Sequence, residues 1–140
     1  MIRHTFKKEE RLTNKKTFDL LFNKGRSIAV PPFRILWIGA KPASSLPVQP
    51  LAPTHLYNRA QLGISVPKRS FPKAVDRNKI KRRIRESYRK NKHLLYEILK
   101  KKNLHIAMMI IYTAKNELPY QEIEKKMIVS LHKIIEHISC

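Results

Sequence analysis

Residues 61–85 read QLGISVPKRSFPKAVDRNKIKRRIR and hold the two patterns that decide the fold. In residues 61–66, apolar side chains alternate with small or polar ones, which is the period of a strand with one buried face. From about Asp76 the apolar residues instead recur every three or four positions, the spacing of one face of a helix. The stretch therefore predicts a strand and then a long helix. The inward-facing strand residues are Leu62, Ile64 and Val66.

The predicted helix runs from about Asp76 toward Lys100 and has one apolar and one basic face. At about 100° per residue, the apolar stripe consists of Ile80, Ile84, Tyr88, Asn91, Leu95 and Ile98. The opposite stripe contains Asn78, Lys81, Arg82, Arg85 and Arg89. Like charges one turn apart destabilise an isolated helix by roughly 0.2–0.5 kcal/mol per pair. We therefore expect a polyanion from outside the chain to compensate the charge of this face.

Positive charge dominates the whole chain and is concentrated around this helix. Thirty Lys and Arg stand against ten Asp and Glu, which gives a formal net charge of +20. Between Arg59 and Lys92 there are 13 basic residues, including the pair Lys68 and Arg69, against two acidic ones. Arginine can bind phosphate through two parallel hydrogen bonds, and each neutralised phosphate releases counterions. The pattern predicts a nucleic-acid partner with a strongly salt-dependent affinity.

A membrane partner and export from the cell are both disfavoured. No apolar run reaches the roughly 18 residues of a membrane span, and the longest, Ile106 to Tyr112, has the length of a strand. The N-terminal residues lack the apolar segment of a secretory signal, so we expect a cytoplasmic protein. The only cysteine, Cys140, stands at the last position and predicts neither a disulfide nor a catalytic thiol.

Two further elements are predicted before the central stretch. A first helix is expected over residues 14–24. Gly25 can adopt the left-handed conformation that ends a helix, and Thr13 or Asn14 can serve as the N-cap residue. The apolar face of this helix consists of Phe18, Leu21 and Phe22. A strand is expected over residues 33–38, because its side chains alternate. One side of this strand carries Phe33, Ile35 and Trp37, and the other carries Arg34 and Leu36.

The remaining segments predict a loop, a strand and a helix. Prolines in residues 40–58 remove backbone donors that regular structure needs, so we expect a surface loop inside a single domain, 1–140. Residues 105–112 predict a buried strand. The last helix has apolar residues at helical spacing, namely Ile123, Met127, Leu131, Ile135 and Ile138. The order helix, strand, strand, helix, strand, helix predicts an α/β sandwich with helices packed on a small sheet.

The sequence has no pattern of a metal centre or a hydrolytic site. Its six histidines are scattered, and zinc-ligand spacing, a glycine-rich phosphate loop and paired carboxylates are all missing. Phosphodiester hydrolysis by a protein usually calls for carboxylates that hold Mg²⁺. The most basic region contains only Asp76 and Glu86. We therefore expect no catalytic residue in this chain and assign no metal ligand to it.

The run from Arg77 to Glu86 resembles the signature of the ribonuclease P protein family, R-N-x-x-K-R-x-x-R-E. All six specified positions match. The strand before it, with its basic pair and the Lys73-Ala74-Val75 approach to the helix, is also similar. Further matches upstream and downstream extend the resemblance over nearly the whole chain; they are Arg11, Leu12, Phe18, Phe22, Gly25, Phe33 and Leu118-Pro119-Tyr120.

The resemblance implies a two-layer sandwich with a four-stranded sheet, in the order αβββαβα, and a left-handed βαβ crossover into the basic helix. It also implies a division of labour. A catalytic RNA subunit cleaves precursor tRNA, with Mg²⁺ held mainly by that RNA. The protein binds the ribonuclease P RNA and the single-stranded 5′ leader of precursor tRNA, and it raises the affinity for substrate and metal. Neither DNA nor a membrane is expected as a partner.

Two sets of site residues follow from the resemblance and the charge pattern. The RNA-facing motif would be Arg77, Asn78, Lys81, Arg82 and Arg85, to which the charge pattern adds Arg89, Lys68 and Arg69. The leader cleft would be lined by Phe18, Phe22, Arg34, Leu36 and Ser65. Aromatic rings stack on unpaired bases for roughly 1–3 kcal/mol each. Spacing alone favours a core position for Phe18 and Phe22, whereas the resemblance favours the cleft.

Other classes of RNA- or DNA-binding protein are compatible with parts of the pattern. The charge alone fits a ribosomal or other structural RNA-binding protein, without a role in cleavage, equally well. A helix-turn-helix DNA-binding protein is disfavoured, because the basic helix follows a strand and not a short helix.

Overall fold

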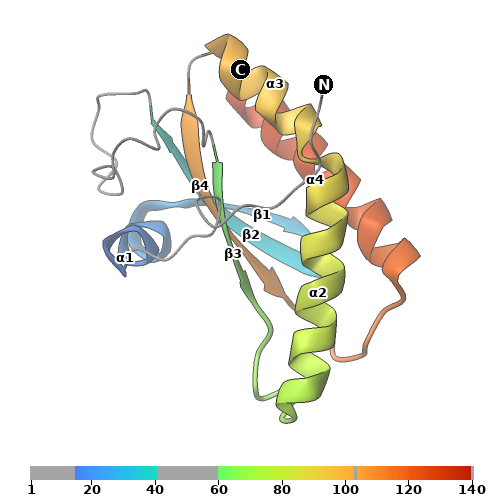
Figure 1. Cartoon of the computed structure of the whole chain (residues 1–140). Helices are drawn as coiled ribbons and strands as arrows, with labels where there is room; N and C mark the ends of the chain where they lie inside the picture. Colours follow the sequence, from blue (N-terminus) through green and yellow to red (C-terminus); the bar gives the residue numbers. More distant parts are fainter. Residues whose placement is uncertain (1–14, 41–59, 103, 140) are drawn as a thin grey trace.

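The computed structural model describes residues 15–40, 60–102 and 104–139 (Figure 1). The N-cap candidates Thr13 and Asn14, the proline-containing loop at 41–59 and Cys140 lie outside these residues. In chain order the elements are α1 (Lys15–Lys24), β1 (Arg26–Val30), β2 (Phe33–Ala40), β3 (Ala60–Ser65), α2 (Ala74–Asn91), α3 (His93–Lys102), β4 (His105–Tyr112) and α4 (Tyr120–Ser139).

The four strands form one mixed sheet in the order β1-β2-β4-β3. The pairs β1/β2 and β2/β4 are antiparallel, whereas β3 and β4 are parallel. The connection from β3 to β4 therefore crosses over, and it does so through α2 and α3. The α/β fold with a four-stranded sheet is confirmed.

One face of the sheet is covered by α2, α3 and α4, as Figure 1 shows. Apolar side chains from all four strands and the three helices form a single buried cluster on this side. The alternation predicted for β2 is confirmed, because Phe33, Ile35 and Trp37 all belong to this cluster. The apolar stripe of the basic helix is also buried here, with Ile80, Ile84, Tyr88 and Leu95.

Among the described elements, α1 is the helix that packs on the opposite face of the sheet (Figure 1). The fully buried Leu21 of α1 packs on Leu36 of β2 and on Ala107 and Met109 of β4. The charge-free strand β4 is consequently buried on both faces, as its sequence indicates. Among the described residues, no helix is long and apolar enough to cross a membrane.

Three local features differ from the sequence-based expectations. Strand β1 was not predicted from its residues. The basic helix, predicted as one, is divided into α2 and α3 at Lys92, although Lys92 keeps helical backbone angles. Gly25 does not adopt the left-handed conformation. Its N–H bonds the carbonyl of Leu21 at 3.0 Å, and a Cβ there would lie 2.5 Å from that oxygen. A steric requirement therefore explains this glycine.

Candidate nucleic-acid interface

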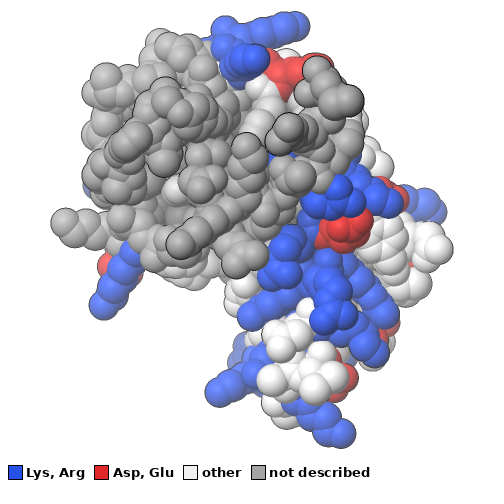
Figure 2. All heavy atoms as spheres, viewed as in Figure 1, with Lys and Arg blue, Asp and Glu red and all other residues white. Residues whose placement is uncertain are grey.

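Helix α2 presents most of its charge on the side that faces away from the sheet. It carries eight basic and two acidic residues, and its buried residues are Ile80, Ile84, Ser87 and Tyr88. Figure 2 shows the Lys and Arg side chains gathered in a band over this helix. Asn78 and Arg82 are exposed, and Lys81, Arg85 and Arg89 are half-buried. The predicted division of the helix into an apolar and a basic face is confirmed.

The first arginine of the signature motif is used inside the fold. Arg77 Nη1 donates to the backbone carbonyls of Phe71 and Pro72 at 2.9 and 2.8 Å. These bonds tie the segment before α2 to the first turn of the helix. That segment follows the exposed pair Lys68 and Arg69. Arg77 thus fixes the approach to α2, and at least one of its donors is committed before RNA is bound.

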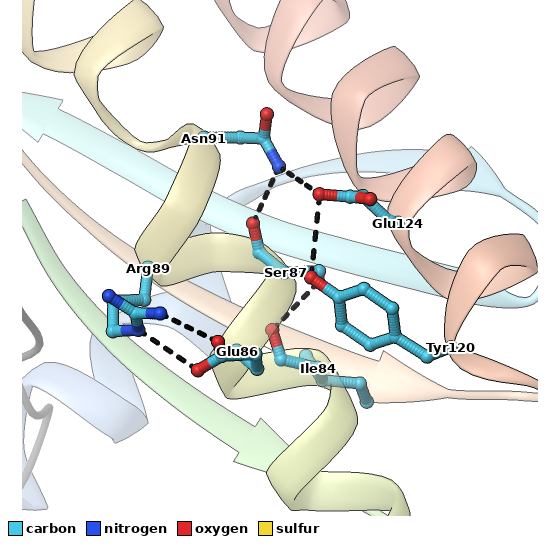
Figure 3. A network of polar contacts seen from close by, with 7 residues as sticks. All are labelled: Ile84, Glu86, Ser87, Arg89, Asn91, Tyr120 and Glu124. Atoms are coloured by element: carbon cyan, nitrogen blue, oxygen red, sulfur yellow. Dashed lines mark hydrogen bonds and ion pairs between the residues drawn. The ribbon is translucent and has the colours of Figure 1, made fainter. Parts of the chain in front are cut away.

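Arg89, another predicted RNA-binding residue, is paired with Glu86 on the same helix. Its Nε and Nη2 donate to the two carboxylate oxygens of Glu86 at 2.9 and 2.6 Å (Figure 3). These bonds lower the pKa of the Glu86 carboxyl, against the opposing effect of desolvation. The same bonds raise the pKa of Arg89. Two parallel hydrogen bonds hold the guanidinium plane in one orientation.

The C-terminal end of α2 is joined to α4 by a polar network (Figure 3). The Asn91 side-chain amide donates to the carbonyl of Ser87 at 2.8 Å and to Oε2 of Glu124 at 3.1 Å. The Tyr120 hydroxyl donates to the same carboxylate oxygen at 3.4 Å. Burial and the nearby Glu124 raise the pKa of Tyr120 to about 12. The network explains how polar Asn91 can lie on the predicted apolar stripe.

Several other side chains of the predicted RNA-binding set are available to a partner. Within the described part of the chain, Asn78, Lys81 and Arg82 make no side-chain hydrogen bond or ion pair, and neither do Lys68 and Arg69. Such cations, carried on a helix whose other side is buried in the core, are suited to phosphate binding. Arg85 lies on the same face, half-buried.

A second surface lies on the sheet face that α1 covers only in part. The strand registers place four residues in one row across all four strands, with β1 at one edge and β3 at the other. These residues are Ala29, Arg34, Ile111 and Ser65. We call them the Arg34 row. Ala29 and Arg34 are exposed, and the other two are half-buried. Arg34 Nε donates to the Ser27 hydroxyl at 3.3 Å.

The neighbouring row of the sheet is covered by α1. It consists of Ser27, Leu36, Met109 and Gly63. Phe18 of α1 packs against this row, and a Cβ on Gly63 would lie 3.3 Å from the Phe18 ring and 3.1 Å from the Met109 methyl group. A glycine at this position therefore lets Phe18 approach the sheet.

The five predicted leader-cleft residues thus differ in location and burial. Arg34 and Ser65 belong to the Arg34 row, and Phe22 of α1 is 61% exposed. Phe18 is half-buried between α1 and the sheet. Leu36 is only 6% exposed, because Leu21 covers it, so its prediction as a lining residue is wrong. Leu36 supports α1 instead.

A contact that the sequence-based reading missed involves Glu117, in the connection between β4 and α4. Its carboxylate lies 3.5 Å from Lys79 Nζ and 3.7 Å from Arg83 Nη1. Arg83 Nη1 also donates to the carbonyl of Leu118 at 2.8 Å. Lys79 and Arg83 fall on unspecified positions of the signature motif, and only their spacing of four residues on α2 hints at a shared partner.

In the described residues, no three His, Cys, Asp or Glu side chains form a group that could hold a metal ion.

Comparison with known proteins gives a consistent result. A family profile described as Ribonuclease P matches residues 6–135. The ribonuclease P protein component of Porphyromonas gingivalis (strain W83) is 31% identical over 134 residues, which cover 94% of this chain and 87% of that protein. The component of Petrotoga mobilis is 39% identical over 88 residues, or 63% of this chain and 61% of the relative.

Solved structures of ribonuclease P proteins share the fold. The protein from Thermotoga maritima matches with a TM-score of 0.61 at 24% identity, over 89% of this chain and 96% of that one. The Staphylococcus aureus protein matches with a TM-score of 0.58 at 24% identity, over 89% and 94%. The signature on α2, the extent of the family match and the shared fold agree, and the chain belongs to the ribonuclease P protein family.

Proposed function

We propose that the chain assists cleavage by docking on the ribonuclease P RNA through α2 while the Arg34 row and α1 hold the 5′ leader of precursor tRNA. As a ribonuclease P protein, it is a subunit of the endoribonuclease that processes the 5′ end of precursor tRNA. One observation carries the docking proposal. Asn78, Lys81 and Arg82 share the outer side of α2 and have no partner among the described residues, within a helix that the core holds firmly.

The leader proposal is supported by the chemistry of the second surface. The Arg34 row offers one cation, one hydroxyl and two apolar side chains. The exposed ring of Phe22 lies on the neighbouring helix α1. Binding of a single strand without sequence preference combines cations that contact phosphates with aromatic rings that stack on bases. Both kinds of group are present, so the surface suits a leader of variable sequence.

We further propose that Mg²⁺ is held mainly by the RNA. Two acidic side chains beside the basic face of α2 are already engaged, since Glu86 pairs with Arg89, and Glu117 lies between Lys79 and Arg83. Phosphate oxygens are good Mg²⁺ ligands, and cations on α2 reduce the repulsion between phosphates that must come close together. The protein would thus lower the Mg²⁺ concentration that cleavage requires. Its expected place of action is the cytoplasm.

The decisive experiment combines the purified chain with ribonuclease P RNA and measures cleavage of precursor tRNA at low Mg²⁺. We expect clear stimulation over the RNA alone, and tighter binding of precursor than of mature tRNA. RNA binding without stimulation, and without a preference for the leader, would instead favour a structural RNA-binding protein. Duplex DNA should compete poorly for the same surface.

A further inference from the structure

Two cations of α2 share a single carboxylate that comes from another part of the chain. Lys79 and Arg83 are four residues apart on the helix and therefore project from neighbouring turns. Glu117 Oε1 lies 3.5 Å from Lys79 Nζ, and Glu117 Oε2 lies 3.7 Å from Arg83 Nη1. Each carboxylate oxygen thus faces a different cation. A phosphate would bind these two cations in the same way, with one of its oxygens directed at each cation.

Hydrogen bonds of the residues on either side of Glu117 hold the connection in place. The hydroxyl of the buried Tyr112 donates to the carbonyl of Asn116 at 2.7 Å and accepts from the N–H of Leu118 at 3.2 Å. Arg83 Nη1 donates to the carbonyl of Leu118 at 2.8 Å. Bonds on both sides of Glu117 in the sequence keep its backbone beside α2. The carboxylate is therefore presented to the two cations by the fold.

The three charged groups remain within reach of solvent. The side chain of Lys79 is 47% exposed, that of Arg83 is 29% exposed and that of Glu117 is 33% exposed. Ion pairs at this exposure are weak and are screened by salt. An RNA phosphate that is brought close by other contacts on α2 can therefore replace the carboxylate. Buried pairs would not permit such an exchange.

We propose that Lys79 and Arg83 form a binding site for an RNA phosphate, which Glu117 occupies as an internal competitor in the free protein. The site lies on the flank of α2 that faces the β4–α4 connection, beside the side that carries Asn78 and Arg82. RNA must displace the carboxylate to use it, so a phosphate that arrives without further contacts gains little. This inference rests on the proposed docking of α2 on RNA.

The test uses the full chain and labelled ribonuclease P RNA, with affinities measured over a range of salt concentrations. Glu117→Gln should tighten binding by about threefold to tenfold at low salt, because the cations no longer have a competing anion, and the gain should shrink as salt is added. The matched control is Glu136→Gln. It makes the same change in net charge at an exposed position near the end of α4 and should alter the affinity little.

A variant of Lys79 gives an independent test if Glu117→Gln disturbs folding. Lys79→Gln changes an exposed side chain, and it should weaken RNA binding in the parent and abolish the gain from Glu117→Gln in the double variant. An equal gain from Glu136→Gln, weaker binding after Glu117→Gln or no effect of Lys79→Gln would each overturn the proposal. Cleavage assays on the parent test the proposed function separately, since RNA binding can follow this pattern whether or not cleavage is stimulated.

Discussion

The basic face of α2 and the Arg34 row differ in how far the fold fixes them before RNA binds. On α2, Arg77, Arg83 and Arg89 each donate to an acceptor of the chain at distances between 2.6 and 2.9 Å. In the Arg34 row, the one cation makes a single longer bond of 3.3 Å to Ser27. The first surface thus combines arginines that the fold orders with cations such as Lys81 and Arg82, which are unpaired among the described residues, and the second is a mostly uncharged strip with one loosely held cation.

This difference indicates how one small domain can divide two tasks between its surfaces, namely binding RNA tightly and selecting the substrate. Phosphate contacts supply affinity that does not depend on sequence, and ordering the arginines in advance reduces the entropy lost on binding. A strip with few charges adds little affinity of this kind, so it can select an unpaired strand by stacking and shape. We infer that α2 determines how tightly RNA binds and that the Arg34 row with α1 determines which substrate is preferred.

The largest expected effect is on stability, from Leu36→Ala beneath α1. Leu36 is buried against Leu21, and removing such a side chain from a core lowers the free energy of unfolding by about 2–5 kcal/mol. Denaturant unfolding measures the loss. Ile38→Ala, half-buried on the same face, should cost less. Because Leu36 does not line the surface, the folded variant should keep its preference for leader-bearing tRNA. If the variant is as stable as the parent but loses its preference for leader-bearing tRNA, Leu36 belongs to the binding surface after all.

The next effect is on affinity, from the combined change Lys81→Ala and Arg82→Ala. If each cation contacts one phosphate, the slope of log affinity against log salt should fall by about 1.4–1.8, and binding should weaken by about tenfold to a hundredfold. Precursor and mature tRNA complexes should be affected alike. The matched control is Lys100→Ala with Lys101→Ala, exposed at the end of α3. An equal loss in that control would show that net charge, and not the position on α2, determines affinity.

The sequence predicted the parts of the fold that depend on local periodicity. The apolar stripe through Ile80, Ile84 and Tyr88 identified the buried side of α2, and the charge-free run of β4 identified a buried strand. Strand β1 is only five residues long, with Ile28 and Val30 inward, and gives too short an alternation to recognise. The break at Lys92 leaves the backbone helical, so no proline or glycine marks it.

The site was predictable only where the position of a side chain follows from its own element. Alternation correctly placed Leu36 on the face opposite Trp37, but whether α1 covers it depends on how the helix docks on the sheet. The hydrogen-bond acceptors of Arg77 and Arg83 are backbone carbonyls of the segments before α2 and α4. Such acceptors carry no side-chain signature, and a sequence motif cannot separate an arginine that positions a segment from one that contacts RNA.

A smaller effect is expected from Phe22→Ala, which tests the selective surface. The ring is 61% exposed, so the fold should lose little stability. Loss of one stacked base at the lower end of the usual range, about 1 kcal/mol, should weaken binding of precursor tRNA about fivefold. Mature tRNA should bind as before, and Val129→Ala, another exposed apolar side chain, should change neither affinity. Equal weakening for both tRNAs would contradict a leader contact at Phe22.

The smallest effect concerns the Glu86–Arg89 pair, which orders one cation of α2. The hydrogen bonds from Arg89 lower the pKa of Glu86 below its ordinary value of 4.5. A lowered pKa in the folded state stabilises the protein above the unfolded value, and this stabilisation is lost as the pH falls through the folded pKa. The Glu86 side chain is 42% exposed, so water screens the pair and the contribution is small.

Unfolding by denaturant between about pH 7 and about pH 3 should show parent and Glu86→Gln converging in stability toward the acidic end. Arg89→Gln should remove the same pH-dependent difference, and the double variant should lose no more than either single one. Additive losses would mean that the two side chains act separately, and that Arg89 is no better ordered before RNA binding than Arg34.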